Sequence, residues 1–252
     1  MAVKKKNLSK DNIDDVNDFQ FSEKPASSTM MNLKISDIPI KVKCLTERQK
    51  ELKKAIEDFE IVIGEGPAGV GKTHMSLLMA LHLLKTEPLK YQKLVLVKSV
   101  QVIKGEEVGF LKGNLDDKLS GHMISFTSNL DKIFGSKAIT KHFIDSGLIE
   151  IVPIAYIRGC TYDRAIMLVD EIQNITLSTF KTIVTRIGED SKFIFLGDSE
   201  QIDLTNKKES CLKKVVELFK DTDFIKVLSF VDSDCVRNPI IPKILEILDK
   251  KE

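Results

Sequence analysis

The sequence predicts an α/β fold built on a doubly wound, mostly parallel sheet. Short apolar runs without polar alternation recur along the chain and alternate with helical patterns. Such runs are typical of parallel strands that are buried on both faces. The first run leads directly into a glycine-rich stretch, and ligands in this fold class bind beyond the carboxyl ends of the strands. A chain of 252 residues has room for one such domain with appendages, or for two small ones.

The predicted elements follow in order along the chain. A helix with Thr46 as its N-cap, "TERQKELKKAIED", precedes the first strand. The predicted strands are Ile61–Ile63, Lys93–Lys98, Leu148–Pro153, Ala165–Val169, Lys192–Leu196 and Phe224–Leu228. The remaining predicted helices are Lys72–Lys85, Leu177–Arg186, Ser210–Lys220 and Pro239–Asp249, with more helix between Leu115 and Ser146. In the first of these, leucines recur at helical spacing and no Pro or Gly interrupts them.

The first 43 residues differ in composition from the rest. They are polar and irregular, with "KKK", "DNIDD" and "SEKPASST", so residues 1–43 are expected to form a flexible N-terminal arm. Residues 44–252 are then expected to form the folded domain. Removal of the arm is expected to leave the melting temperature nearly unchanged.

Composition limits the possible partners and compartments. The net charge of +1 gives no overall footprint for nucleic acid, so such binding would depend on a local patch. The four cysteines are widely spaced and form no C-x-x-C pair, which favours reduced thiols over a disulfide framework or a zinc site. The N-terminus lacks the apolar core of a signal peptide, and no stretch has the length of a membrane span. We therefore expect a cytoplasmic protein that does not associate with membranes.

The stretch "GPAGVGKT" has the pattern G-x-x-x-x-G-K-[ST] of a phosphate-binding loop, or P-loop. Backbone N–H groups of such a loop point at a polyphosphate, and the helix that follows adds the positive end of its dipole. Lys72 is expected along the β- and γ-phosphates, and the Thr73 hydroxyl on Mg²⁺. A glycine turn beside a chance lysine is the alternative, but the strand before it and the helix after it favour the P-loop. The predicted nucleotide-binding positions are Gly66, Pro67, Ala68, Gly69, Val70, Gly71, Lys72, Thr73 and His74.

Two further strands end in polar residues. In "AIMLVDEIQN", Asp170 is expected to hold the Mg²⁺ together with Thr73, and Glu171 to activate the attacking water. Acidic residues often end strands without such a role, but the upstream P-loop favours the functional reading. In "FIFLGDSEQ", Gln201 could reach the γ-phosphate or the water, while Asp198 and Gln201 also suit a simple turn.

Taken with these motifs, "TRIGEDSKFIFLGDSEQIDL", "CVRNP", "LVLVKSVQVIKGEEVGFLKGNLDDK" and "YIRGCTYDRA" resemble the PhoH-like family of P-loop ATPases. The resemblance covers about Thr46 to Leu248. It implies a RecA-like P-loop NTPase core related to superfamily 1 helicases, with ATP and Mg²⁺ as cofactors. It also implies a role in RNA metabolism, single-stranded RNA as a partner, and assembly into a homo-oligomeric, hexameric ring. The segment before the core is too short for the nuclease domain of some relatives, so we expect the short form of the family.

The resemblance assigns roles to two more residues. Gln49 matches the glutamine that reads adenine ahead of the P-loop, although a glutamine on a charged helix is often merely solvated. Arg237 matches a late arginine that completes the γ-phosphate site, although an arginine before Asn-Pro could equally start a helix. This chain departs from the family at Lys98 and Cys160, where arginine is usual. A lysine replaces a point charge but not a bidentate fork, so a phosphate or RNA role at these positions is in doubt.

The leading function is therefore ATP hydrolysis, with catalytic roles for Lys72, Glu171, Gln201 and Arg237, coupled to remodelling or unwinding of RNA. The chain has room for only one motor lobe after the P-loop. Either a neighbouring subunit supplies the second wall of the site, with Arg237 acting in trans, or the protein is an ATP-driven switch without unwinding activity. One alternative is an RNA-binding or assembly protein that the nucleotide only stabilises. Another is a P-loop kinase for small molecules, which the scarcity of arginines for a lid disfavours.

Overall fold

The computed structural model describes residues 32–99 and 115–236. The chain divides into two compact units, Met1–Leu33 and Lys34–Glu252, and the fold below is that of the second. Arg237 and the predicted helix Pro239–Asp249 lie outside the described residues. So does most of the segment between the second predicted strand and the helix that follows it.

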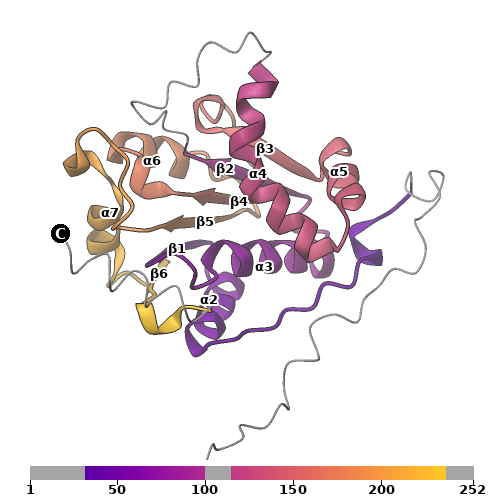
Figure 1. Cartoon of the computed structure of the whole chain (residues 1–252), viewed down its shortest axis with the longest axis horizontal. Coiled ribbons are helices and arrows are strands. Elements are labelled where there is room, and N and C mark those ends of the chain that lie inside the picture. Colours follow the sequence, from indigo (N-terminus) through magenta and orange to yellow (C-terminus); the bar gives the residue numbers. More distant parts are fainter. Residues whose placement is uncertain (1–31, 100–114, 237–252) are drawn as a thin grey trace, which may run out of the picture. The chain divides into compact units, whose positions relative to one another are not determined.

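A six-stranded sheet forms the centre of this unit, in the order β3-β2-β4-β5-β1-β6 (Figure 1). Every neighbouring pair is parallel. The α/β fold class is therefore confirmed, and the described sheet is parallel throughout. The strands are β1 (Ile61–Glu65), β2 (Lys93–Lys98), β3 (Ile149–Pro153), β4 (Ala165–Asp170), β5 (Lys192–Gly197) and β6 (Ile225–Ser229).

Six α-helices accompany the described strands. They are α2 (Glu47–Asp58), α3 (Lys72–Thr86), α4 (Leu115–Phe134), α5 (Lys137–Asp145), α6 (Leu177–Val184) and α7 (Leu212–Phe219). Short 3₁₀ turns are η1 (Ile35–Asp37), η2 (Ile154–Tyr156), η3 (Ile172–Asn174), η4 (Lys207–Glu209) and η5 (Asp232–Asp234). The Thr46 hydroxyl accepts a hydrogen bond from the Gln49 N–H at 3.2 Å and so caps α2, as its sequence predicts.

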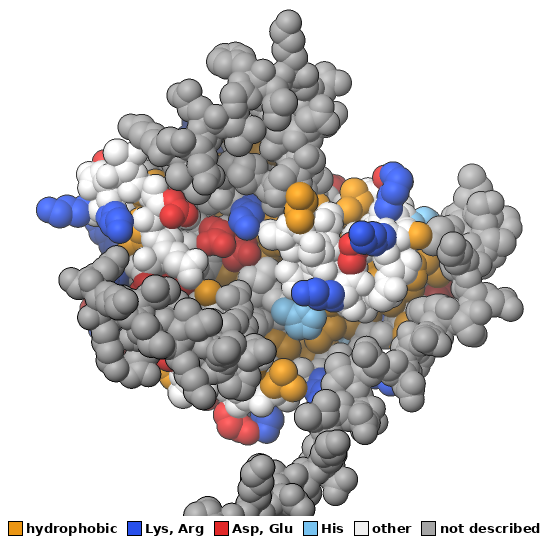
Figure 2. All heavy atoms as spheres, in the orientation of Figure 1, with side chains coloured by type: hydrophobic (Ala, Val, Ile, Leu, Met, Phe, Trp, Pro, Cys, Tyr) orange, Lys and Arg blue, Asp and Glu red, His pale blue; other side chains and the backbone are white. Residues whose placement is uncertain are grey.

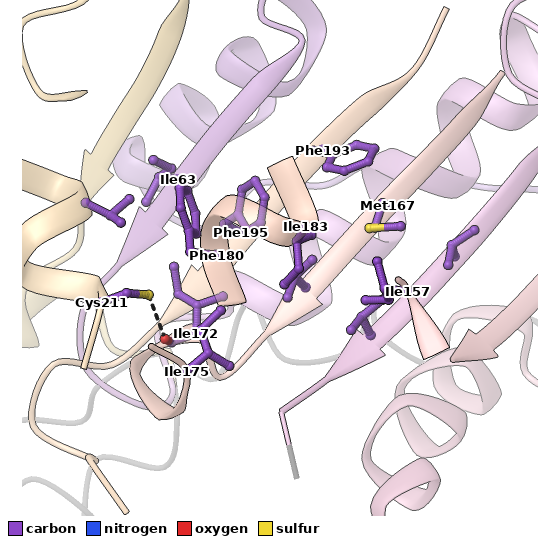
Figure 3. Close-up of a cluster of buried hydrophobic side chains, with 14 of the residues drawn as sticks. Ile63, Ile157, Met167, Ile172, Ile175, Phe180, Ile183, Phe193, Phe195 and Cys211 are labelled. Atoms are coloured by element: carbon purple, nitrogen blue, oxygen red, sulfur yellow. Dashed lines mark hydrogen bonds between the residues drawn. The ribbon is translucent and has the colours of Figure 1, made fainter. Parts of the chain in front are cut away.

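The two faces of the sheet are buried by different helices. Successive strand residues point to opposite faces, so one set packs under α6 and α7 and the other under α2 and α3. On the first face, the rings of Phe180 in α6 and Phe195 in β5 lie 4.8 Å apart (Figure 3). Within the same cluster, the Cys211 thiol donates to the Ile172 carbonyl oxygen at 3.2 Å. The core therefore fixes β5, η3 and α7 relative to one another.

Helix α3 is enclosed on most sides. It contacts β2, β4 and β5 as well as α2 and α4, and ten of its fifteen residues are buried. Apolar residues all round a helix are typical of such a position. The P-loop therefore stands on a rigid support. In the described part of the chain, no helix is long and apolar enough to cross a membrane.

The segment before α2 is part of the folded unit from Lys34 onward, whereas composition predicts an arm that extends to residue 43. Turn η1 contacts α3. Ile38 is only 3% exposed, and the Lys85 ammonium donates to its carbonyl oxygen at 2.6 Å. Composition alone did not reveal this packing, because a single buried isoleucine creates no periodic pattern.

We therefore expect two truncations to differ. Deletion of residues 1–33 should leave the melting temperature unchanged. Deletion of residues 1–43 should lower it by several degrees, because burial of one isoleucine is worth about 1.5–3 kcal/mol and each kcal/mol corresponds to about 2–4 °C at this size. Thermal unfolding followed by circular dichroism measures both, with Ile38→Ala in the full chain as a matched control. Equal melting temperatures for the two truncations would contradict this packing.

Candidate active site

Three strand ends meet at one edge of the sheet. Because β5 lies between β1 and β4, the loop after β5 emerges between the P-loop and the acidic pair Asp170–Glu171. A cavity of about 420 Å³ opens there. On the face shown in Figure 2, acidic and basic side chains lie next to each other near the middle, with a histidine nearby. Of the predicted site residues, those that line the cavity are Ala68, Gly69, Gly71, Lys72, Thr73, His74, Asp170, Glu171 and Gln201.

Two P-loop glycines are required by their backbone conformation and by the atoms packed around them. Gly66 has φ +139°, and a Cβ there would lie 2.6 Å from the Phe230 carbonyl oxygen. Gly71 has φ +86°, and a Cβ there would lie 2.8 Å from the Gln49 side-chain nitrogen. Both the left-handed backbone and the close neighbours exclude larger residues. The loop is also tied to the sheet, because the Gly66 N–H donates to the Gly197 carbonyl oxygen at 3.1 Å.

The Lys72 side chain is held inside the loop. Its ammonium group donates to the carbonyl oxygens of Gly66 at 2.6 Å and Pro67 at 2.8 Å. The residue is 9% exposed and lines the cavity. A buried ammonium group is costly unless it is hydrogen-bonded, so these carbonyl oxygens stabilise the cation at the cavity wall.

Thr73 and Asp170 are in direct contact although 97 residues separate them. The Thr73 hydroxyl donates to a carboxylate oxygen of Asp170 at 3.1 Å, and the other carboxylate oxygen accepts from the Glu171 N–H at 3.1 Å. Burial raises the pKa of Asp170 to about 6; the charge of Glu171 adds to the rise, while Lys98 and Thr73 oppose it. A hydroxyl and a carboxylate side by side fit the oxygen ligands that Mg²⁺ prefers.

The backbone at Glu171 adopts a left-handed conformation with φ +62°. Such a conformation costs about 1–3 kcal/mol in a residue other than glycine and is often found at functional sites. One carboxylate oxygen accepts from the Gln173 side chain at 2.6 Å, and the other lies 3.9 Å from the Lys98 ammonium group. The Glu171 side chain is 34% exposed, so it remains accessible to water in the cavity.

Lys98 stands at the end of β2, next to Asp170 in the sheet register. Besides the contact with Glu171, its ammonium group donates to the Ser125 hydroxyl of α4 at 3.1 Å. The lysine thus contacts the acidic pair as a single positive charge. Cys160, the other departure from the family pattern, is exposed and does not line the cavity.

Asp198 and Gln201 form a turn and also line the cavity. An Asp198 carboxylate oxygen accepts from the Glu200 N–H at 3.0 Å, and the Gln201 N–H donates to the Asp198 carbonyl oxygen at 3.3 Å. These residues can therefore form a turn and still take part in the site. The predicted contact of Gln201 with phosphate or water stays a prediction.

Gln49 is buried behind the P-loop. Its side-chain nitrogen donates to the Val70 carbonyl oxygen at 3.0 Å, and its side-chain oxygen accepts from the Leu45 N–H at 2.8 Å. It is 2% exposed and does not line the cavity. After these two bonds, the Gln49 carboxamide still has one donor and one acceptor position for a further hydrogen bond. The contact of Gln49 with adenine stays a prediction.

Sequence reasoning missed the residues that line or brace the cavity from outside the motifs. Asn129 and Lys132 of α4 line it, and Asn129 hydrogen-bonds the His74 imidazole. Loss of solvation lowers the pKa of His74 and the nearby Lys132 adds to this effect, while the Asn129 bond opposes it. No local pattern could reveal α4, because only tertiary packing brings it to the P-loop. Gln173, in contrast, lies within "VDEIQN", where a polar pair after an apolar strand was a visible signal.

A glycine-rich loop between a buried parallel strand and a helix, facing a carboxylate on another strand, defines a nucleotide-binding domain of the P-loop class. The comparison with known sequences agrees. The chain belongs to the PhoH-like protein family, whose sequence profile matches residues 41–249.

Two curated relatives and one solved structure illustrate the similarity. The PhoH-like protein of Bacillus subtilis (strain 168) is 38% identical over 210 residues, which is 83% of this chain and 65% of the relative. Protein PhoH of Escherichia coli (strain K12) is 30% identical over 200 residues, 79% of this chain and 56% of the relative. The large terminase of a thermophilic bacteriophage shares the fold, with a TM-score of 0.50 and 12% identity over 81% of this chain and 50% of that chain. The chain thus spans less than two thirds of these relatives.

The raised pKa of Asp170 predicts that this carboxylate lowers the stability of the folded protein, and that the loss of stability depends on pH. A carboxyl whose pKa is higher in the folded state binds protons more tightly there, so stability falls as the pH rises from about 4 to above 6. Asp170→Asn should therefore stabilise the protein without metal or nucleotide by up to about 3 kcal/mol at pH 8. Urea unfolding at pH 8 and pH 4.5 measures this, and the gain should shrink at the lower pH. A loss of stability at pH 8, or a gain that is independent of pH, would contradict it.

Proposed function

We propose that this protein binds ATP with Mg²⁺ in the cavity and hydrolyses it to ADP and phosphate. The observation that carries this proposal is the contact between Thr73 of the P-loop and the buried Asp170, with the partly exposed Glu171 as the next residue. This contact supports the proposal because a hydroxyl and a carboxylate, the oxygen ligands that Mg²⁺ prefers, line the same cavity as a second, partly exposed carboxylate.

The chemistry follows from the positions of these groups. The P-loop N–H groups and Lys72 bind and orient the phosphates, and Thr73 and Asp170 would hold the metal. Mg²⁺, when bound, supplies positive charge that offsets the charge of the phosphate oxygens. Glu171 accepts a proton from the attacking water, which then bonds to the γ-phosphorus as the bond to the ADP oxygen breaks. Gln201 contacts the γ-phosphate or the water, and Gln49 contacts adenine.

A finer proposal concerns the partners. We propose that turnover is coupled to single-stranded RNA and that the chain works as a ring of identical subunits, hexameric in the form that the family resemblance favours. The support is that resemblance. The described chain ends at Val236, whose N–H donates to the Gly69 carbonyl oxygen at 3.1 Å and which lines the cavity. Because Arg237 is the next residue, either the same chain's phosphates or a neighbour's are candidate targets for its guanidinium group.

Two substitutions should separate binding from chemistry. Lys72→Ala should weaken ATP binding, because it removes a cation that contacts the phosphates. Glu171→Gln should retain binding but slow hydrolysis by about 10²–10⁴-fold, the usual effect of losing a general base. Titration calorimetry and phosphate release, with and without single-stranded RNA, measure the two effects. Glu200→Gln is a matched control, because this exposed carboxylate lies on the loop after β5 but does not line the cavity. Wild-type turnover in Glu171→Gln would refute the base assignment, and binding of ATP without turnover in the wild type would favour a purely structural nucleotide.

A mixing experiment tests whether Arg237 acts within its own chain or on a neighbouring chain. Arg237→Ala should reduce turnover, since a catalytic arginine is worth about 10³–10⁵ in rate. If Arg237 acts on a neighbour, a mixture of Arg237→Ala and Glu171→Gln chains should regain turnover, because the first keeps its base and borrows the second's arginine. A mixture that co-assembles but stays inactive would show action within one chain. Normal turnover of Arg237→Ala alone would exclude a catalytic role.

A further inference from the structure

Gln173 makes three hydrogen bonds that join two parts of the site. Its side-chain nitrogen donates to a Glu171 carboxylate oxygen at 2.6 Å and to the Gln201 carbonyl oxygen at 3.0 Å. Its side-chain oxygen accepts from the Asp198 N–H at 3.0 Å. The residue is 0% exposed, so water cannot replace these partners. One carboxamide therefore connects the end of β4 with the loop after β5.

The three bonds require both donor and acceptor in one neutral side chain. The carboxamide uses both of its N–H donors and one acceptor position here. A glutamate at this position could still accept from Asp198, but its second oxygen would face the Glu171 carboxylate and the Gln201 carbonyl oxygen. An apolar side chain would leave the buried Asp198 N–H without this partner, which costs about 1–3 kcal/mol.

The position of the amide is itself fixed by β5. Gly197 is the last residue of β5, and a Cβ there would lie 3.0 Å from the Gln173 side-chain oxygen and 2.9 Å from a Leu212 methyl group. The amide thus fits closely against the strand end. Any displacement of the β5 loop must move Gln173, and with it the oxygen of Glu171 that it holds.

Glu171 has few other constraints on its carboxylate. Its side chain is 34% exposed, and the nearest described cation, Lys98, lies 3.9 Å from the oxygen that Gln173 does not hold. The short bond from Gln173 is therefore the main contact that sets the direction of the carboxylate.

We propose that Gln173 is a positioning residue for hydrolysis: it orients the Glu171 carboxylate and couples that orientation to the loop that carries Gln201. This inference rests on the proposed function, in which Glu171 is the base and Gln201 contacts the γ-phosphate or the water. A change at Gln201 on loss of the γ-phosphate would then reach Glu171 through one side chain.

The neighbouring residue offers a matched control. Asn174 ties the same turn to the same loop, donating to an Asp203 carboxylate oxygen at 3.1 Å and accepting from the Asp203 N–H at 2.8 Å. It is 4% exposed, and neither of these bonds involves Glu171. Asn174→Ala therefore loosens turn η3 without removing the contact to the base.

The experiment compares Gln173→Ala, Gln173→Glu and Asn174→Ala for ADP affinity, melting temperature and turnover at saturating ATP. Both Gln173 variants should lose about 10–100-fold in turnover with ADP affinity changed by less than about threefold, because a positioned base contributes about 10²–10⁴-fold. Asn174→Ala should lose stability but keep its turnover within about fivefold. An equal loss of turnover in Asn174→Ala, or unchanged turnover in Gln173→Ala, would overturn the proposal.

A second measurement remains valid even if one single variant folds poorly. In a Glu171→Gln background, adding Gln173→Glu should reduce the residual turnover by less than about threefold, because residues that act through one group are not additive. A full further loss would show that Gln173 does not act through Glu171. Failure of the proposed function itself would look different, because wild type and Glu171→Gln would then have the same turnover.

Discussion

Strand β5 lies between the strand that ends in the P-loop and the strand that ends in Asp170, and this order determines which groups can meet. The Gly66 N–H bonds to the end of β5 on one side, and Gln173 bonds to the loop after β5 on the other. In a parallel sheet all carboxyl ends share one edge, so the polar residues that follow three strands converge without long connections. The cavity exists because the sheet order brings these loops together.

The same arrangement carries local costs that the core offsets. Asp170 is a buried carboxyl with a raised pKa, and Glu171 has a left-handed backbone. Neither feature would persist in an isolated loop. Both are held because β4 is fully buried within the sheet and because Ile172, the residue that follows, belongs to the core beneath α6 and α7. Stored strain and an unfavourable charge at one point are typical of functional sites.

The sequence predicted the fold class, every strand of the described sheet to within two residues, and the motif residues at the cavity. These predictions succeed because the signals are local. A strand, a glycine-rich loop and an acidic pair can each be recognised within a stretch of about ten residues. Lys98 was noted only as a departure from a family pattern, and its contacts with Glu171 and Ser125 come from the sheet register and from α4. Asn129 and Lys132 reach the P-loop only through helix packing, and Ile38 is buried without any periodic signal. These contacts arise from tertiary packing, which the spacing of residues along the sequence does not indicate.

The proposed function requires that water accept the γ-phosphoryl group, because Glu171 is proposed to take a proton from it. The most direct measurement is to supply ATP and Mg²⁺ in water enriched in oxygen-18 and to analyse the phosphate released by mass spectrometry. If the protein hydrolyses ATP in this way, each phosphate carries one labelled oxygen and forms in equal amount with ADP, and both products are strongly reduced in Glu171→Gln. ADP formed without labelled phosphate would contradict it, since the phosphoryl group would then have gone to another acceptor.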